Sequence, residues 1–255
     1  MTKAIVLAGS SNNGRLQECS GETNEALIKI GNRCMVEYVV EALIQAQNVE
    51  EVIIAGPKEK LVRVFEQNIH IKVAESGTTI VQSLLNAVRL LDVNREDRIL
   101  VVTSDIPLIT GTIIDNFLVK ASQEDADIIY PIVSETLNQE KFPGVKRTYV
   151  KLKEGIFTGG NVFLINPRII GPCAKYAEEL VKYRKSPFKL LQYIGFSYVF
   201  KYLLRRLSIS DAQNRVGELF RIKGRAIIVS DPEIGVDVDK PSDLELVQRI
   251  IGKLA

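Results

Sequence analysis

The amino-terminal stretch constrains this chain most, because a short apolar run leads directly into a loop of small residues. Ala4 to Ala8 is uninterrupted apolar sequence, which is typical of a strand buried on both faces of a parallel sheet. The loop from Gly9 to Arg15 contains two glycines, two serines and two asparagines before the arginine. Its backbone N–H groups are free to point at an anion, and Arg15 adds a positive charge. The stretch predicts a polyphosphate site, with an ordinary strand-to-helix turn as the alternative.

The residues of this loop exclude two common nucleotide-binding motifs. Gly9 and Gly14 have the spacing of a P-loop, but Arg15 and Leu16 stand where that motif requires Lys and then Ser or Thr. Without that hydroxyl group the loop lacks the magnesium ligand of a P-loop NTPase. The dinucleotide pattern G-x-G-x-x-G is also absent from the loop. What remains is the pattern L-A-G-S-x-x-x-G-R, formed by Leu7, Ala8, Gly9, Ser10, Gly14 and Arg15.

Apolar runs and amphipathic segments alternate along the chain. Strands are expected at residues 4–8, 52–55, 69–73, 98–103, 127–133, 149–152, 162–165 and 226–229. Helices are expected at 35–43, 58–67 and 76–91, and from 241 onward, with a polar loop over 135–147. Strand and helix alternating at this spacing predict an α/β fold with a doubly wound, mostly parallel sheet of the Rossmann-like kind.

Three aspartates are candidates for a metal site. Asp105 follows the strand at 98–103, and ligands of a doubly wound sheet bind beyond the carboxyl ends of the strands. Asp237 and Asp239 alternate with valines, so both carboxylates face the same side of an extended segment. Asp105 with Asp237 or Asp239 supplies the few oxygen ligands that magnesium takes from a protein. The alternatives are a helix cap for Asp105 and a surface acid pair for the other two.

Composition narrows the class of protein. The 33 basic and 31 acidic residues of the 255 nearly cancel, which argues against nucleic acid as a partner. The three cysteines form no C-x-x-C pair, so neither structural zinc nor a disulfide framework is expected, and a reducing cytoplasm fits. The first residues predict a strand and no secretory signal. His70 is the only histidine and is expected at a strand edge, away from any nucleophile.

Residues 168–223 are expected to form a helical insertion. Within it, 188–207 is apolar almost all the way round a helix, but four basic residues interrupt it too often for a transmembrane span. Three interpretations stay open: a buried insertion over the acceptor side, a subunit interface of a homo-oligomer, or a peripheral helix at a lipid surface. We expect one domain over 1–255, with a nucleotide-binding half (1–134) and an acceptor half (135–255).

Six short motifs occur in order over nearly the whole chain. They are Leu7–Arg15, Ala26–Tyr38, Gly77–Thr79, Thr103–Leu108, Gly159–Asn161 and Val238–Leu244. Together they resemble the nucleotidyltransferases with a glycosyltransferase-A type of fold, which include the MobA-like molybdenum-cofactor guanylyltransferases and the sugar-phosphate uridylyltransferases. The resemblance implies that the Gly9 loop and Arg15 hold the triphosphate of an NTP, and that Gly77 and Thr78 lie near the base.

The same resemblance implies the remaining site residues. Asp105 is implied to bind Mg²⁺, with Asp239 as the second ligand of the family motif and Asp237 as the reserve. Gly160 and Asn161 are implied to face the acceptor. The implied function is a magnesium-dependent transfer of NMP from an NTP to a phosphorylated small-molecule acceptor, with release of pyrophosphate.

One position departs from the family pattern. The family has a lysine that touches the α-phosphate just before its second motif, and this chain has Glu25 there, with Lys29 four residues later. A catalytically impaired nucleotide-binding or regulatory homologue is therefore the main alternative. A glycosyltransferase using a nucleotide-sugar is less favoured, because it requires Asp-x-Asp where this chain has Thr103-Ser104-Asp105.

Overall fold

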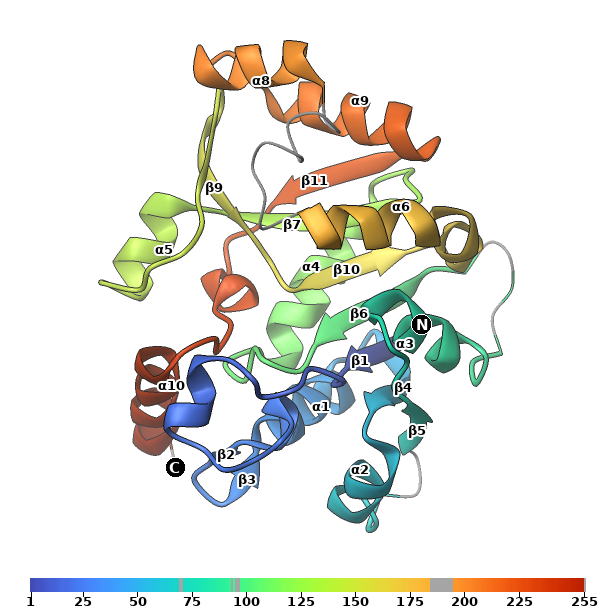
Figure 1. The fold of residues 1–255 in the computed structure, drawn as a ribbon, viewed down its shortest axis with the longest axis vertical. Coiled ribbons are helices and arrows are strands. Elements are labelled where there is room, and N and C mark those ends of the chain that lie inside the picture. Colours follow the sequence, from blue (N-terminus) through green and yellow to red (C-terminus); the bar gives the residue numbers. More distant parts are fainter. Residues whose placement is uncertain (69–70, 93, 95–96, 184–194, 255) are drawn as a thin grey trace.

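The computed structural model describes residues 1–254 except 69–70, 93, 95–96 and 184–194. Its centre is a nine-stranded sheet with β5, β4, β1, β6, β10 and β7 in that order (Figure 1). β9 pairs with β7 and β8 with β9, while β11 pairs with β7. Among the described strands of this sheet, β9 and β10 run against the other seven. The strands are β1 (Thr2–Leu7), β4 (Val49–Gly56), β5 (Ile71–Glu75), β6 (Ile99–Thr103), β7 (Ile128–Ser134), β8 (Val150–Leu152), β9 (Gly155–Gly159), β10 (Val162–Ile165) and β11 (Gly224–Ile228).

Helices cover both faces of the sheet (Figure 1). Side chains alternate between the faces along a strand, so Ala4 and Val6 join one core cluster and Ile5 joins the other. Helices α1 (Met35–Gln45) and α4 (Gly111–Ser122) pack in the first cluster, and α3 (Ile80–Val88) and α6 (Ile170–Tyr183) pack in the second. This arrangement confirms the doubly wound α/β fold. The other helices are α2 (Lys58–Val64), α5 (Glu135–Lys141), α8 (Phe196–Leu203), α9 (Ile209–Phe220) and α10 (Pro241–Leu254).

A third cluster of buried side chains ties the amino-terminal loop to the end of the chain. Leu16 and Ile28 come from the loop, Val236 and Val238 from the segment before α10, and Leu244 from α10 itself. All five are at most 5% exposed. The loop and the aspartate segment are therefore held against each other by apolar packing. A small hairpin of β2 (Lys29–Ile30) and β3 (Arg33–Cys34) lies between the loop and α1.

One local prediction and one of the alternatives are wrong. Residues 135–147 are not all loop, because α5 begins at Glu135, where the Ser134 side chain accepts a hydrogen bond from the Leu137 N–H. Asp105 does not cap the helix after it, because α4 begins at Gly111 and the Thr110 side chain caps it. The polar composition of 135–147 concealed α5, and Thr110, which is adjacent to α4, caps that helix in place of Asp105.

Within the helical insertion, α6 packs against α3, while α8 and α9 extend beyond β11, at the far end of the sheet from β5 (Figure 1). Part of the 188–207 stretch lies outside the described residues, as does His70. For the described part, the interpretation as a buried insertion is wrong, because α8 contains no buried residue. Among the described helices, none is both long and apolar enough to cross a membrane.

Candidate active site

Two of the predicted loops meet beyond the carboxyl ends of the parallel strands. Gly9 follows β1 and approaches Ser76, which follows β5: a Cβ atom added to Gly9 would lie 3.1 Å from the Ser76 Cβ. Ser104, which follows β6, donates its backbone N–H to the Leu7 carbonyl oxygen at 3.2 Å. The phosphate loop, the loop predicted to lie near the base and the Asp105 turn therefore lie at one edge of the sheet, where ligands of doubly wound folds bind.

The phosphate loop is folded back on itself. The Asn24 side chain donates to the Ala8 carbonyl at 3.0 Å, and the Glu25 N–H donates to the Ser10 carbonyl at 3.1 Å. Only a short 3-10 turn, Arg15–Glu18, follows Gly14, so no full helix adds its dipole here. Arg15 is exposed and makes no ion pair within the described part of the chain. Its guanidinium group is therefore available to an anion.

Glu25 is located where the family pattern requires a lysine, directly against the backbone of this loop. Its charge contributes to the electrostatics of Asp105, as described below. A second basic residue reaches the same region from another element, because Lys60 Nζ of α2 lies 2.9 Å from the Thr23 hydroxyl oxygen. Lys29 is exposed in β2, two residues beyond the short turn that Glu25 opens. The sequence pattern gave no indication of Lys60, since its contact spans 37 residues.

The polar groups of the loop at Gly77 and Thr78 already have hydrogen-bond partners within the protein. Ser83 Oγ accepts a hydrogen bond from the Gly77 N–H at 2.9 Å. Gln82 Oε1 accepts from the Thr78 N–H at 3.0 Å and from the Thr78 hydroxyl group at 2.8 Å. Gln82 also packs so closely on Gly77 that an added Cβ would lie 2.5 Å from its side chain. A base bound here by Thr78 must first displace Gln82.

Asp105, Asp237 and Asp239 form an acidic cluster in which one carboxylate oxygen of each lies within 4.8 Å of the others. Asp105 also accepts a hydrogen bond from the Thr103 hydroxyl group. Burial raises the pKa of the Asp105 carboxyl group to about 6, and the charges of Asp239 and Glu25 add to the shift. Burial and the charges of Asp239 and Asp105 also raise the pKa of Asp237. Three carboxylates this close together fit a hard divalent cation, which would remove their mutual repulsion.

Alternating burial directs two of these carboxylates to one side. Val236 and Val238 are at most 1% exposed and belong to the third core cluster, so Asp237 and Asp239 project away from it. The Val238 N–H donates to the Asp105 carbonyl oxygen at 2.9 Å, which fixes the segment beside the end of β6. The segment is not a strand, but its side chains keep the alternation of one.

Arg147 was not foreseen from the sequence. Its side chain is 7% exposed, with Nη1 2.9 Å from Asp237 Oδ1 and 3.8 Å from Asp243 Oδ2. Nη2 donates to the Asp237 carbonyl oxygen at 2.7 Å. The guanidinium group lowers the pKa of Asp237 in opposition to burial. Asp105 and Asp239 have no such counter-charge among the described residues, so they are the members of the cluster that most need a cation.

Gly160 and Asn161 lie at the same edge of the sheet. Asn161 donates its N–H to the Ile234 carbonyl at 2.8 Å and accepts from the Thr103 N–H at 3.1 Å. A Cβ atom on Gly160 would lie 2.9 Å from Pro131 Cγ and 3.2 Å from the Ile234 backbone. Glycine is therefore needed at 160 because another chain segment approaches closely, and a simple tight turn does not explain it. Contact of either residue with an acceptor stays a prediction.

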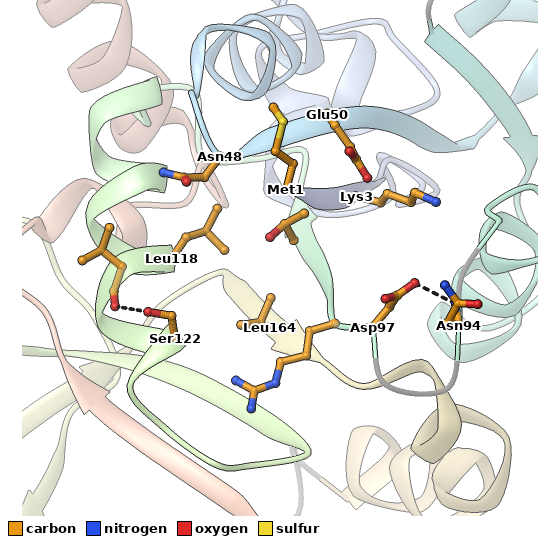
Figure 2. A pocket seen from close by; sticks show the side chains of 12 residues that line it. Met1, Lys3, Asn48, Glu50, Asn94, Asp97, Leu118, Ser122 and Leu164 are labelled. Carbon is orange, nitrogen blue, oxygen red and sulfur yellow. Dashed lines mark hydrogen bonds between the residues drawn. The ribbon is translucent and has the colours of Figure 1, made fainter.

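A cavity of about 670 Å³ lies at the opposite edge of the sheet (Figure 2). It is lined by charges of both signs, including Lys3, Glu50, Asp97 and Arg98. None of the predicted site residues lines it. The candidate active site is therefore the open edge near Gly9 and Asp105 and not this cavity.

Comparison with known proteins identifies the family to which this chain is similar. Residues 4–198 match the family of the MobA-like NTP transferase domain. A 2-C-methyl-D-erythritol 4-phosphate cytidylyltransferase of Thermotoga neapolitana is 26% identical over 140 residues, which span 54% of this chain and 61% of that protein.

Solved structures extend the similarity over the whole chain. A hypothetical transferase from Thermus thermophilus is 33% identical, with a TM-score of 0.82 over 95% of this chain and 99% of that one. A CMP:2-keto-3-deoxy-manno-octonic acid synthetase complexed with CTP has a TM-score of 0.67 over the full length of both chains at 13% identity, which shows a shared fold. The family match covers most of this chain, and the chain therefore belongs to the MobA-like NTP transferase domain family.

Proposed function

We propose that this protein is a nucleotidyltransferase that moves an NMP group from an NTP to a phosphorylated small-molecule acceptor and releases pyrophosphate. The observation that carries the proposal is the acidic cluster of Asp105, Asp237 and Asp239, located beside the phosphate loop at the carboxyl edge of the sheet. Family membership supports the reaction class. An NTP substrate and three free thiols fit a reducing, cytoplasmic setting.

The reaction needs positioning and charge neutralisation more than covalent chemistry by the protein. An oxygen of the acceptor phosphate forms a bond to the α-phosphorus, and the bond from that phosphorus to the bridging oxygen breaks. The electron pair leaves with pyrophosphate. An acceptor phosphate is already ionised at neutral pH, so no general base is required. In this proposal the Gly9 loop and Arg15 orient the triphosphate, and Asn161 orients the acceptor.

Asp105 and Asp239 are proposed to hold Mg²⁺. A bound Mg²⁺ ion neutralises charge on the phosphate oxygens and orients them. The raised pKa of Asp105 and the missing counter-charges of these two residues support this assignment. Asp237 is the reserve ligand, because Arg147 already neutralises its charge.

The similar proteins guide the choice of nucleotide and acceptor to test. The Thermotoga relative is named a cytidylyltransferase, and the synthetase of similar fold is complexed with CTP. We therefore propose CTP as the first nucleotide to test. A sugar phosphate, a phosphorylated polyol and a molybdopterin are the acceptor classes to compare.

A catalytically impaired nucleotide-binding homologue is the second candidate. Glu25 favours it, because its backbone N–H binds the phosphate loop and its carboxylate would repel a triphosphate held there. The acidic cluster argues against it, since a protein without metal chemistry gains nothing from three adjacent carboxylates.

Thermal unfolding with each of the four NTPs, with and without Mg²⁺, tests the proposal. A ligand that binds only the folded state raises the melting temperature. We expect one NTP to do so in the presence of Mg²⁺ and to fail in Asp105→Ala. Pyrophosphate release with each acceptor class then measures turnover. Binding of an NTP without any turnover would leave the impaired homologue as the function.

A further inference from the structure

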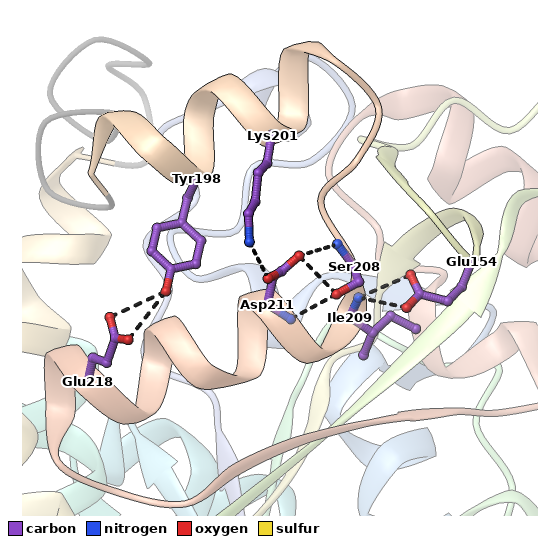
Figure 3. Close-up of polar contacts among 7 residues, drawn as sticks. All are labelled: Glu154, Tyr198, Lys201, Ser208, Ile209, Asp211 and Glu218. Atoms are coloured by element: carbon purple, nitrogen blue, oxygen red, sulfur yellow. Dashed lines mark hydrogen bonds and ion pairs between the residues drawn. The ribbon is translucent and has the colours of Figure 1, made fainter.

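Helix α8 has its amphipathic faces reversed relative to an ordinary surface helix. Its polar side chains Tyr198 and Lys201 point toward α9 (Figure 3), whereas its apolar side chains Phe196, Phe200 and Leu203 are exposed. An ordinary surface helix buries its apolar stripe against the core. The reversal is a feature of residues 196–204, and none of the eight residues of α8 is buried.

Polar contacts hold the inner face of α8 to α9. Lys201 Nζ lies 2.6 Å from Asp211 Oδ1. The Tyr198 hydroxyl group lies 3.4 Å from both carboxylate oxygens of Glu218 (Figure 3). The Arg215 guanidinium carbon lies 5.3 Å from the centre of the tyrosine ring. These contacts fix the rotation of α8 about its own axis. The apolar side chains cannot turn inward without breaking them.

The outer face of α8 is a continuous apolar stripe. Phe196 is 74% exposed, Phe200 64% and Leu203 71%. Their spacing of four and three residues places them on one side of the helix. No described residue covers them. Apolar side chains concentrated on one exposed helix face mark a surface that contacts another apolar phase.

Basic residues lie next to this stripe. Arg205 and Arg206 follow the helix directly, are exposed, and make no ion pair within the described part of the chain. From residue 195 to 223 the chain has six basic residues and two acidic ones, whereas the rest of the sequence has 27 basic and 29 acidic residues. The insertion is therefore a cationic region on an otherwise slightly acidic protein.

The stripe lies where a flat surface can reach it. α8 forms one end of the long axis of the molecule, remote from α10 (Figure 1). The segment that joins α8 to α9 is anchored to the turn between β8 and β9: Glu154 accepts from the Ile209 N–H at 3.0 Å, and the Lys153 N–H donates to the Leu207 carbonyl at 2.8 Å. These contacts help to hold α8 in place at the outer surface of the molecule.

We propose that α8 and the two arginines after it dock onto an anionic lipid bilayer. The apolar stripe inserts among the acyl chains, and Arg205 and Arg206 contact the anionic headgroups. A second copy of the chain fits the stripe less well, because pairing would bring two strongly cationic insertions together. The inference concerns the location of the protein and stands independently of its proposed reaction.

Sedimentation with vesicles tests the proposal. The full chain is mixed with vesicles of equal parts phosphatidylcholine and phosphatidylglycerol, or of phosphatidylcholine alone, at low and at high salt. We expect binding to the anionic vesicles at low salt, reduced by salt and weak with phosphatidylcholine alone. Arg205→Gln with Arg206→Gln should weaken the partition by about fivefold for each charge. Phe200→Ser with Leu203→Ser should weaken it by about tenfold or more.

A matched control uses exposed apolar residues elsewhere. Ile44 on α1 and Val119 on α4 are 54% and 58% exposed, and Ile44→Ser with Val119→Ser should leave vesicle binding unchanged. Melting temperatures near the unmutated value show that the variants are folded. Absence of binding at low salt, or equal binding by the stripe variant and the control, would overturn the proposal. Self-association that Phe200→Ser with Leu203→Ser abolishes, without vesicle binding, would overturn it in favour of a second copy.

Discussion

Arg147 Nη1 lies 2.9 Å from Asp237 Oδ1, and the same side chain donates to the Asp237 carbonyl oxygen at 2.7 Å. One guanidinium group thus binds both the carboxylate and the backbone of a residue 90 positions later. It also faces Asp243 in the first turn of α10. Because Arg147 neutralises Asp237, that residue needs a bound cation less than Asp105 and Asp239 do.

Replacing Arg147 should destabilise the protein. Arg147→Gln leaves Asp237 and Asp243 without their buried cation, and breaking such a pair costs about 3–5 kcal/mol. Arg33→Gln is the matched control, because Arg33 pairs with Glu41 on the surface, where loss costs about 1 kcal/mol or less. Urea denaturation measures both free energies of unfolding. Similar losses in the two variants would show that Arg147 has no special structural role.

Removing a metal-binding carboxylate should abolish most activity while leaving the fold intact. We expect Asp105→Asn and Asp239→Asn each to lower kcat by about 10²-fold or more, as loss of a preorganised charge contact does. Asp237→Asn should lower it less, because Arg147 already holds that carboxylate. Asp125→Asn, at an exposed pair with Lys223, is the control. Pyrophosphate release measures the rates, and a larger loss in Asp237→Asn would exchange the roles of Asp237 and Asp239.

The raised pKa of Asp105 predicts a pH dependence of stability. Its pKa is about 6 in the folded protein and about 3.8 as an ordinary side chain, so the folded state binds more protons between these values. Stability from this group is therefore fully present below about pH 4 and is lost as the pH rises past about 6. Without metal, Asp105→Asn should become more stable relative to the unmutated protein as the pH rises through this window.

Mg²⁺ should act in the opposite direction. It binds the ionised carboxylates, so its stabilising effect should grow as the pH rises through the same window. Melting temperatures with Mg²⁺ and with a chelator, measured across the window for both proteins, give the comparison. A Mg²⁺ effect that is constant with pH, or equal in Asp105→Asn, would contradict the assignment of Asp105 as a ligand.

Glu25 should limit nucleotide binding. Glu25→Lys replaces a repelling charge beside the phosphate loop by an attracting one, and we expect NTP affinity to rise by about fivefold or more. Titration calorimetry with the preferred NTP measures it. No change in affinity would show that the Glu25 side chain does not face the triphosphate.

Lys60 is proposed to supply part of the charge that Glu25 removes, since it reaches Thr23 at 2.9 Å. Lys60→Ala should weaken NTP binding, whereas Lys58→Ala, exposed at the start of the same helix, should not. The loss in Lys60→Ala should be smaller when Glu25→Lys is also present. Equal losses in both backgrounds would show that the two positions act separately.

Local sequence predicted most of the framework. Buried apolar runs marked the parallel strands, as at Ala4–Ala8, because a strand covered on both faces needs apolar side chains throughout. The rule that ligands bind beyond the carboxyl ends of strands placed Asp105 near the phosphate loop. The alternation of valine and aspartate before α10 directed Asp237 and Asp239 to one side. Each of these predictions combines the pattern of short stretches of sequence with a general rule of strand or sheet geometry.

The tertiary structure decided what depends on distant residues. Arg147 is one charge in a polar stretch until folding brings Asp237 and Asp243 around it, and Lys60 has no visible partner until α2 reaches Thr23. The sequence showed that residues 188–207 are apolar, but only the contacts of Lys201 and Tyr198 with α9 determine that the apolar side of α8 faces outward. Periodicity specifies that a helix has two different faces. Which face the protein covers depends on the partners that folding supplies.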